Sequence, residues 1–500
     1  MHVRGIVMLP LRAVHVQISE HVHVLGTTTR RKPLFQRFGT CTMKRSASPF
    51  TGPPHSKRAR TGSTASNDSN ENQHQQGDWP AKEGEIEAAR RFILEWSDPE
   101  PPSRLFKHIL NPRSAAAKTK TLIVPDKDAD GLASGSILQR TLILLGLPSS
   151  LINIHLVQRG NNIHEPSERT AMTEVSPSYV FVLDQGSRRS LPVVDTPNHR
   201  ALVIDHHQAA EDDFPSGSQH VTACNSPPVA TSALLTYLVC RPLHPAIEEQ
   251  CAWLAVLGTH GDLGTNFKWQ PPFPDMSTVL KRYTRKKLND AVSLINAPRR
   301  AYAYNVSAAW ESLIQAAGPA DLLTNKALLA ARAEVNAEVE RCTHVPPKFS
   351  SDGRVAVLRM KSKAQIHPVI ATRWAGHLKS AKLEVVMAAN EGYLEGKVNF
   401  SCRVAKCARQ RSGGRGEVNI IELLNDIVER AEDPSLRERL GESFARGHKE
   451  ASGGVVPTRE FEEMMALMGV GAGSRKKTNP VTPEKQKNTI SNYFGKKEGS

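Results

Sequence analysis

One stretch of sequence decides the fold: Ala201-Leu202-Val203-Ile204-Asp205-His206-His207, residues 201–207. Its four apolar residues predict a buried strand of a parallel sheet, because strands covered on both faces are continuously hydrophobic. The strand delivers one carboxylate and two imidazoles at its carboxyl end, the edge where open α/β sheets bind ligands. In isolation, a capped turn with one solvated and one hydrogen-bonded histidine would also explain the motif. The neighbouring strands decide between these interpretations.

Two further predicted strands also end in acidic residues. Residues 122–124 lead into Asp126-Lys127-Asp128-Ala129-Asp130-Gly131, and residues 179–183 lead into Asp184. Three aspartates on alternate residues repel one another unless a cation offsets their charge. A calcium-binding EF-hand loop opens in the same way, but its twelfth position must be acidic and is Ile137 here. A phosphatase of the haloacid dehalogenase type also has Asp-x-Asp after a strand, but it gives no reason for a later Asp-His-His.

Helix and strand patterns alternate in this part of the chain. Residues 132–145 predict a helix and residues 152–157 another strand, which indicates a doubly wound α/β fold with a mostly parallel sheet. Because parallel strands end at one edge, their acidic residues should share a site. A further acid, Asp262, comes after Gly258 and Gly261, and we expect these glycines to form a tight turn that presents it.

Carboxylates and imidazoles together favour a hydrolytic metal centre. Hydrolysis of a phosphodiester needs an activated water and neutralisation of the transferred phosphoryl group, which two metal ions about 3.5–4 Å apart supply. Oxygen and imidazole ligands suit Mn²⁺, with Mg²⁺ as the alternative, and we expect two ions. The seven cysteines include no Cys-x-x-Cys pair, which argues against structural zinc and indicates a reducing compartment.

The order of these motifs resembles the DHH phosphoesterase superfamily, and especially its RecJ-like exonuclease branch. Asn296-Ala297 with Arg299 and Arg300 is similar to the Asn-Ala-x-x-Arg segment of that family. Residues 447–453 are similar to the Gly-Gly-His-x-x-Ala-x-Gly signature of its accessory domain, although Arg446 replaces the first glycine. Ser401 and Arg403 match its Ser-x-Arg element, which resembles a phosphate clamp.

The resemblance implies a role for each motif residue. The implied metal ligands are Asp128, Asp130, Asp184, His206 and Asp262, with Asp184 as the bridge between two ions. The implied catalytic residues are His207, which would contact the scissile phosphate, and Asp205 and Asp126, either of which could orient a neighbouring ligand. The implied substrate-binding residues are Ser401, Arg403, Gly447, His448 and Arg299.

The composition, the periodicity and the family resemblance together divide the chain into five predicted parts. These are a disordered basic tail over residues 1–79, a DHH catalytic domain over 80–325, a linker helix over 326–347, an accessory substrate-binding domain over 348–470 and a disordered basic tail over 471–500. The accessory domain, a smaller α/β unit, should contain strands at residues 355–360, 383–388 and 397–403, with helices at 366–378 and 420–430.

Short motifs in the tails predict a nuclear protein. Lys and Arg number 65 against 50 Asp and Glu, a formal charge of +15 that suits a polyanionic partner. Lys44-Arg45 and Lys57-Arg58-Ala59-Arg60 resemble a bipartite signal for the nuclear import receptor. Ile490, Tyr493 and Phe494 resemble the PIP box that docks on the sliding clamp, although Lys487 stands where that motif has glutamine.

The first 42 residues leave another location open. They are rich in arginine and poor in acid, as organelle transit peptides are, so a mitochondrial or cytoplasmic location is the alternative. Met43 offers a second start, so these residues need not belong to the mature protein. No apolar run approaches the roughly 20 residues that cross a bilayer, and we expect no membrane partner.

Three functions from different classes follow from the sequence. The leading one is a metal-dependent exonuclease on single-stranded DNA or RNA in nuclear replication or repair. The second is a phosphodiesterase or phosphatase of short oligonucleotides or small nucleotides, which the lack of an added oligonucleotide-binding barrel would suit. The third is a non-catalytic replication scaffold, like the DHH-fold subunit of the replicative helicase, but that subunit has lost the metal ligands that are all present here.

Overall fold

The computed structural model describes residues 78–95, 120–412 and 418–471, all within one unit of the chain, residues 69–500. The predicted import signal and the clamp-binding residues Ile490, Tyr493 and Phe494 lie outside the described residues. Trp79 corrects the predicted end of the N-terminal tail, because its indole N–H donates to the Pro228 carbonyl at 2.9 Å and its ring packs edge-on against Phe273. None of the described helices is long and apolar enough to span a membrane.

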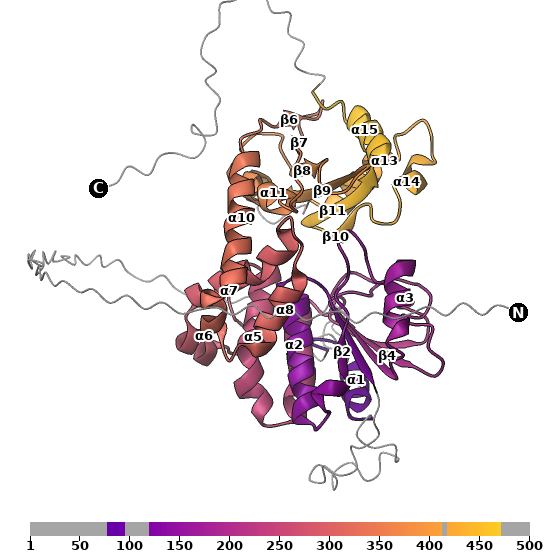
Figure 1. Cartoon of the computed structure of the whole chain (residues 1–500). Coiled ribbons are helices and arrows are strands. Elements are labelled where there is room, and N and C mark those ends of the chain that lie inside the picture. Colours follow the sequence, from indigo (N-terminus) through magenta and orange to yellow (C-terminus); the bar gives the residue numbers. More distant parts are fainter. Residues whose placement is uncertain (1–77, 96–119, 413–417, 472–500) are drawn as a thin grey trace, which may run out of the picture. The chain divides into compact units, whose positions relative to one another are not determined.

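Five parallel strands form the first sheet, in the order β2-β1-β3-β4-β5. Figure 1 labels two of them, β2 and β4, in the lower part of the view. Their bounds are β1 Thr121–Pro125, β2 Ile152–Ile154, β3 Tyr179–Leu183, β4 Arg200–Asp205 and β5 Ser218–Thr222. Strand β2 is shorter than predicted, and β5 was not predicted because its sequence Ser-Gln-His-Val-Thr lacks a long apolar run.

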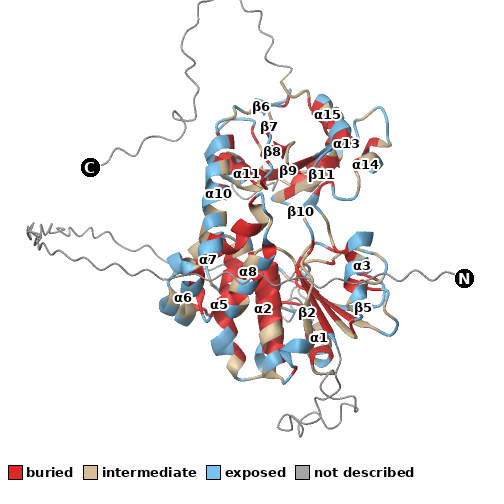
Figure 2. Cartoon of the chain, in the orientation of Figure 1, coloured by how far each residue is buried: buried red, intermediate tan, exposed pale blue. Residues whose placement is uncertain are grey.

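Both faces of this sheet are covered, which confirms the doubly wound fold. Ile123, Phe181 and Leu202 point into one core, whereas Leu122, Val180 and Val203 point into another, because side chains alternate along a strand. The first core contains residues of α1 Glu83–Glu95, α2 Ala129–Leu144, α4 Ser232–Cys240, α5 Ala246–Asp262, α7 Arg285–Arg300, α8 Val306–Gln315 and α9 Pro319–Thr324. The second core contains Met172 of α3 Pro166–Glu174. Figure 2 shows the buried residues concentrated on these strands and on α2. The short elements η2 Ser149–Leu151, η3 Arg241–Leu243 and α6 Ser277–Tyr283 complete this part.

The predicted tight turn before Asp262 is wrong, because Gly258 and Gly261 belong to helix α5. A Cβ at Gly258 would lie 2.4 Å from the Ala233 Cβ and 2.6 Å from the Asp130 Oδ1. The glycine is therefore needed for close packing of α5 against α4 and the start of α2. Asp262 is the last residue of the buried helix α5, which holds it more rigidly than a loop would.

A long helix, α10 Lys326–Cys342, begins where the linker helix was predicted to begin and ends five residues before its predicted end. Its Leu328 packs in the core of the parallel sheet, while Val335, Val339 and Cys342 pack in the core of the second sheet. One apolar face thus contributes to two cores.

The second sheet has six strands in the order β10-β11-β9-β8-β7-β6, of which only β7 and β8 pair in parallel. Its bounds are β6 Lys348–Phe349, β7 Val355–Met360, β8 Val385–Asn390, β9 Lys397–Val404, β10 Arg446–His448 and β11 Ala451–Pro457. Its helices are α11 His367–His377, α12 Lys406–Ser412, α13 Ile420–Val428, α14 Leu436–Arg439 and α15 Thr458–Leu467. The three predicted strands and two predicted helices of the accessory domain are all present within a few residues, which confirms a smaller α/β unit.

Candidate metal centre

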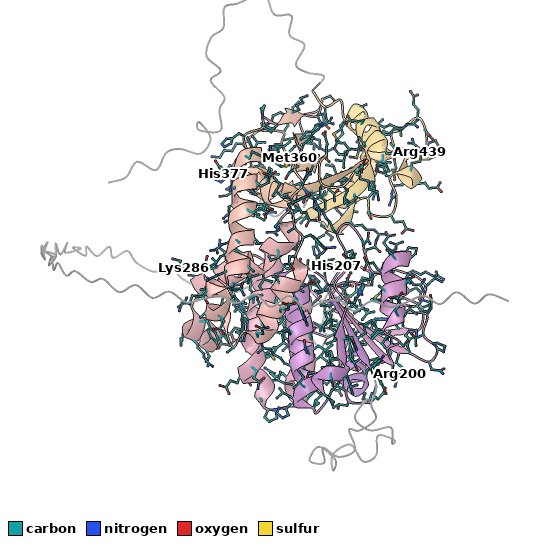
Figure 3. All side chains as sticks on the ribbon, in the orientation of Figure 1. Arg200, His207, Lys286, Met360, His377 and Arg439 are labelled. Carbon is teal, nitrogen blue, oxygen red and sulfur yellow. The ribbon has the colours of Figure 1, made fainter. Side chains whose placement is uncertain are left out.

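The ends of three parallel strands meet at one edge of the first sheet. The strand ladder continues one residue beyond β1 and β3, since the Asp126 N–H donates to the Leu183 carbonyl and the Asp184 N–H donates to the Ile204 carbonyl, both at 2.9 Å. Figure 3 shows Arg200, the first residue of β4, and His207, just past its end, at opposite edges of the sheet. The predicted acids and histidines therefore gather at the carboxyl edge.

Asp130, His206 and Asp262 form the first group of potential ligands, with donor atoms within 4.8 Å of one another. The His206 Nε2 lies 3.2 Å from both the Asp184 Oδ1 and the Asp262 Oδ2. Despite these short distances, this buried nitrogen makes no hydrogen bond of acceptable geometry. Asp262 is the open member of the group, because 23% of its side chain is exposed.

Asp126, Asp128 and Asp184 form a second group with the same spacing limit. Asp184 belongs to this group and also lies next to the first, because its Oδ1 is 3.2 Å from the His206 Nε2. Its backbone adopts the left-handed conformation, with φ of 61°, which non-glycine residues rarely adopt. Such strain often marks a functional position. Gly131 permits the close turn of the Asp-rich loop, because a Cβ there would lie 2.6 Å from the Asp126 carbonyl oxygen.

The first turn of helix α4 anchors the buried carboxylates of Asp130 and Asp184. Backbone N–H groups of Ser232 and Ala233, in the first turn of α4, donate to the two oxygens of Asp130 at 2.8 and 3.1 Å. The Ser232 hydroxyl donates to the Asp184 Oδ1 at 2.9 Å. The positive end of the α4 dipole thus faces the acidic cluster and offsets part of its charge.

Asp205 orients His207 through a hydrogen bond to its ring. Its Oδ1 accepts hydrogen bonds from the His207 Nδ1 at 2.8 Å and from the His206 backbone N–H at 2.7 Å. Its Oδ2 accepts from the hydroxyl and backbone N–H of Ser187, at 2.7 and 3.2 Å. Both oxygens are therefore occupied, which makes Asp205 a positioning residue and leaves the Nε2 of His207 available.

The charges of the cluster suit a cation. Burial raises the pKa of Asp130 to about 7 and raises the pKa of Asp184 well above its ordinary value, and neighbouring carboxylates add to both shifts. Burial alone would lower the pKa of His206, but the carboxylates of Asp184 and Asp262 raise it well above its ordinary value. A metal ion would remove the need for these protons and would be bound by the buried His206 Nε2, so the residues present fit a metal site.

His448 contacts the centre from the second sheet. Its ring stacks on that of His207 at a centroid distance of 5.4 Å and an angle of 13°, and lies 5.4 Å from the ring of His206. Gly447 has φ of 114°, and a Cβ there would lie 2.6 Å from the Ala451 carbonyl oxygen, so the hairpin that presents His448 requires glycine.

Three arginines, Arg299, Arg300 and Arg403, form what we call the arginine cluster. Arg299, the predicted substrate contact, is engaged with Asp128 at 3.5 Å and with the Asn296 Oδ1 at 3.0 Å. Arg300 makes no ion pair with a carboxylate in the described part of the chain, and its buried Nε has no hydrogen-bond partner. Burial, with the charges of Arg299 and Arg403 adding to it, lowers the pKa of Arg300 to about 9.

Ser401, another predicted substrate residue, lies beside Arg403 of this cluster. Arg403 donates to the Ser401 hydroxyl at 2.7 Å, and burial lowers its pKa. His367 is buried near all three arginines. Burial is the main cause that lowers its pKa to about 3, and the positive charges of the three arginines add to it. The cluster holds more positive than negative charge, as a site for a phosphate would.

Sequence reasoning missed Ser187, Ser232 and His367, and it chose Arg299 instead of Arg300 as the substrate contact. Ser232 follows Thr231, the N-cap of an apolar helix, so a capping pattern was the available signal. Arg300, rather than Arg299, occupies the arginine position of the Asn-Ala-x-x-Arg segment. Nothing in the local sequence marks His367.

Comparisons with known proteins agree with this geometry. The sequence model of the DHH family, N-terminal domain, matches residues 120–259. No curated protein matches the chain. The DHH domain of a protein described as a member of a ribosomal protein family has 13% sequence identity and a TM-score of 0.52, covering 77% of this chain and 95% of that one.

Two structures of the exonuclease RecJ are also similar. Mn²⁺-bound RecJ from Thermus thermophilus has 18% identity and a TM-score of 0.49, and this chain covers 59% of its length with 79% of its own. A manganese-bound exonuclease RecJ has 18% identity and a TM-score of 0.47, with coverage of 76% of this chain and 97% of that one.

The parallel sheet with its acidic carboxyl edge defines a phosphoesterase fold of the DHH type. Residues 120–259 form a DHH-family domain, which confirms the superfamily predicted from the Asp-x-Asp-x-Asp-Gly and Asp-His-His motifs.

Proposed function

We propose that this protein is a metal-dependent phosphodiesterase, a RecJ-like exonuclease that hydrolyses single-stranded nucleic acid. The observation that carries the proposal is the acidic and histidine cluster at the carboxyl edge of the parallel sheet, with the His206 Nε2 between the carboxylates of Asp184 and Asp262. The adjacent arginine cluster supplies the complementary charge for a phosphate.

The two groups of ligands would hold two ions. Asp130, His206 and Asp262 would hold one, and Asp128 and Asp184, with Asp126 beside them, would hold the other. The placement of Asp184 next to both groups suits it to bridge them. We propose Mn²⁺, with Mg²⁺ as the alternative, because carboxylate ligands suit both ions. Such ions, when bound, supply an activated water and offset the charge of the phosphoryl group.

The protein side chains perform the remaining tasks. His207 keeps its Nδ1 proton on Asp205 and so presents its Nε2 to the phosphate that is cut. Arg403, Arg300 and Ser401 would bind the phosphate group of the terminal nucleotide, and Arg299 would act through Asp128 instead of touching substrate. His448 and the Gly447 turn would cover the reacting group from the second sheet.

The test is a comparison of substrates with the purified full chain and Mn²⁺. Single-stranded DNA and RNA, labelled at either end, should be shortened progressively from one end, and the variant His206→Ala should be inactive. Hydrolysis of a dinucleotide without hydrolysis of longer strands would favour the small-nucleotide phosphodiesterase instead. Absence of hydrolysis of any of these substrates would contradict the proposal and favour the scaffold.

We further propose a role in nuclear replication or repair, supported by the import-like basic clusters and by the clamp-binding motif in the tails. A peptide of residues 485–497 should bind the sliding clamp, through Ile490, Tyr493 and Phe494, more weakly than a motif with the usual glutamine. The control peptide carries Tyr493→Ala and Phe494→Ala. Equal binding by both peptides would remove this part of the proposal.

A further inference from the structure

We propose that Arg446 and Arg188 form a second phosphate-binding position, across the metal centre from the arginine cluster. An oligonucleotide would then be held on both sides of the bond that is cut. The inference rests on the proposed function, because it concerns the nucleic acid on which that centre would act.

Arg446 lies on the same hairpin as His448. Strand β10 pairs with β11 so that Arg446 stands opposite Gly453 and His448 opposite Ala451. Only Gly447 separates Arg446 from His448, whose ring contacts His206 and His207, so Arg446 lies close to the metal centre along the chain. The accessory-domain signature has a glycine at this position, so the guanidinium is an addition to the pattern that this chain resembles.

Arg188 reaches the same place from the catalytic domain. It follows the turn in which Asp184 joins the ligand groups and Ser187 donates to Asp205. The side chain of Arg188 forms an ion pair with Glu442, and the Arg446 Nε donates to the backbone carbonyl of Glu442 at 2.9 Å. Glu442 therefore brings the two guanidinium groups together.

The two arginines repel each other and their neighbours. Burial, and then the charge of Arg446, lowers the pKa of Arg188. Burial, followed by Arg188, Arg169 and Arg446, lowers the pKa of His164 to about 4. Arg169 is balanced by Asp195 at 2.6 Å, whereas Arg446 has no carboxylate partner among the described residues.

Two exposed carboxylates, those of Glu165 and Glu442, offset this charge in part. We infer that Glu442 occupies the position of a phosphate group. The charge of Glu165 opposes the lowering of the Arg188 pKa, and 66% of the Glu442 side chain is exposed. An exposed carboxylate on a half-buried guanidinium occupies the place that a phosphate oxygen would take, since both anions accept the same paired hydrogen bonds. A phosphodiester would displace Glu442 and contact both arginines.

This position and the arginine cluster approach the centre from opposite faces of the parallel sheet. Helix α7, which ends in Arg299 and Arg300, packs in the core of one face. Ile163 and Val193, which flank the loops of His164 and Arg188, pack in the core of the other face. A single strand that crosses the carboxyl edge would meet one set of arginines on each side of the metal centre.

The experiment measures binding of a fluorescent single-stranded DNA of about ten nucleotides by anisotropy, in chelator so that no bond is cut. Arg446→Ala should weaken binding about tenfold, and the dependence of log affinity on log salt should become shallower by about 0.7, the value for one phosphate contact of a single strand. Glu442→Gln should strengthen binding, because it removes the competing carboxylate. Arg459→Ala and Glu438→Gln, at exposed positions of the second sheet and its helices, are the matched controls.

The decisive result is that Arg446→Ala weakens binding of the DNA whereas Glu442→Gln strengthens it. If the cluster only held the two sheets together, Glu442→Gln would weaken or leave unchanged the affinity for DNA, and either result would overturn the inference. Arg446→Ala should also reduce the preference, in kcat/KM with Mn²⁺, for the longer strand over a dinucleotide. Wild-type hydrolysis with no effect of Arg446→Ala on affinity or salt dependence would overturn the inference and leave the proposed function intact. A wild-type protein that neither binds nor hydrolyses the strand would overturn both.

Discussion

Asp205→Asn is a nearly isosteric change whose cost can be worked out from the structure. Five donors from His206, His207 and Ser187 converge on the carboxylate of Asp205. An amide offers one oxygen acceptor and turns an NH₂ group toward some of these donors. If that NH₂ faces Ser187, the hydroxyl can rotate to accept, but the Ser187 backbone N–H is left buried without a partner, at a cost of about 1–3 kcal/mol.

Loss of the negative charge adds to this cost. Hydrogen bonds to charged groups contribute about 1.5–3 kcal/mol, and the bond from the His207 ring is one of them. We therefore expect the free energy of unfolding in chelator to fall by about 2–4 kcal/mol near pH 5, measured by urea denaturation. Asp195→Asn is the control, because Asp195 is 67% exposed in its pair with Arg169 and should change the stability by less than about 0.5 kcal/mol.

The difference between wild type and Asp205→Asn should depend on pH in a specific way. Burial alone would raise the pKa of Asp205, but the charge and hydrogen bond of His207 lower it, so its contribution is complete above about pH 4 and is lost as the pH falls toward the folded pKa. Burial alone would lower the pKa of His207, but Asp205 raises it, so that contribution is complete below about pH 6.5 and is lost as the pH rises through the folded pKa. The difference should be largest between about pH 4 and 6.5. A difference as small as that of Asp195→Asn at pH 5 would refute this reasoning.

Three further predictions concern packing, acid stability and substrate binding. Gly258→Ala should destabilise the protein by about 1–3 kcal/mol in a thermal melt and weaken Mn²⁺ binding, because the new Cβ would press on Ala233 and Asp130. The control is Gly84→Ala, in an exposed part of α1 where a Cβ would have no atom within 4 Å, and it should be neutral or stabilising in the same melt. The pKa of His367 is lowered to about 3, so only the unfolded chain binds a proton at this histidine as the pH falls below about 6.5. The free energy of unfolding of wild type relative to His367→Asn should therefore fall by about 1.4 kcal/mol per pH unit, down to about pH 3. If the stabilities of the two proteins depended on pH in the same way, His367 would not be a buried neutral histidine. Arg403→Ala should raise the KM for oligonucleotides about tenfold and lower kcat less, and an unchanged KM would remove Arg403 from the substrate site.

The sequence predicts those features that depend on local pattern. The apolar runs before Asp126, Asp184 and Asp205 identify the strands, and the rule for parallel strands then places their acids at one edge. Helix α10 is predicted from its apolar face, because Leu328, Val335 and Val339 recur at helical spacing.

The features that the sequence does not predict depend on contacts between distant residues. Gly258 and Gly261 resemble turn residues in the sequence. Glycine is needed at these positions because α4 and the start of α2 approach helix α5 closely. The choice between Arg299 and Arg300 depends on which of them meets Asp128, and that contact is 171 residues away in sequence. His367 becomes a site residue only because α11 lies near the arginine cluster.

The most direct test of the metal-dependent phosphodiesterase is hydrolysis of an end-labelled single-stranded oligonucleotide by wild type and by Asp184→Ala, with and without Mn²⁺. Asp184 is fixed by the ladder from β4 and is adjacent to both ligand groups, so its loss should abolish turnover while the circular dichroism spectrum stays that of wild type. The account predicts Mn²⁺-dependent cleavage by wild type alone. Cleavage by the folded Asp184→Ala variant at the wild-type rate, or by wild type in chelator, would contradict it.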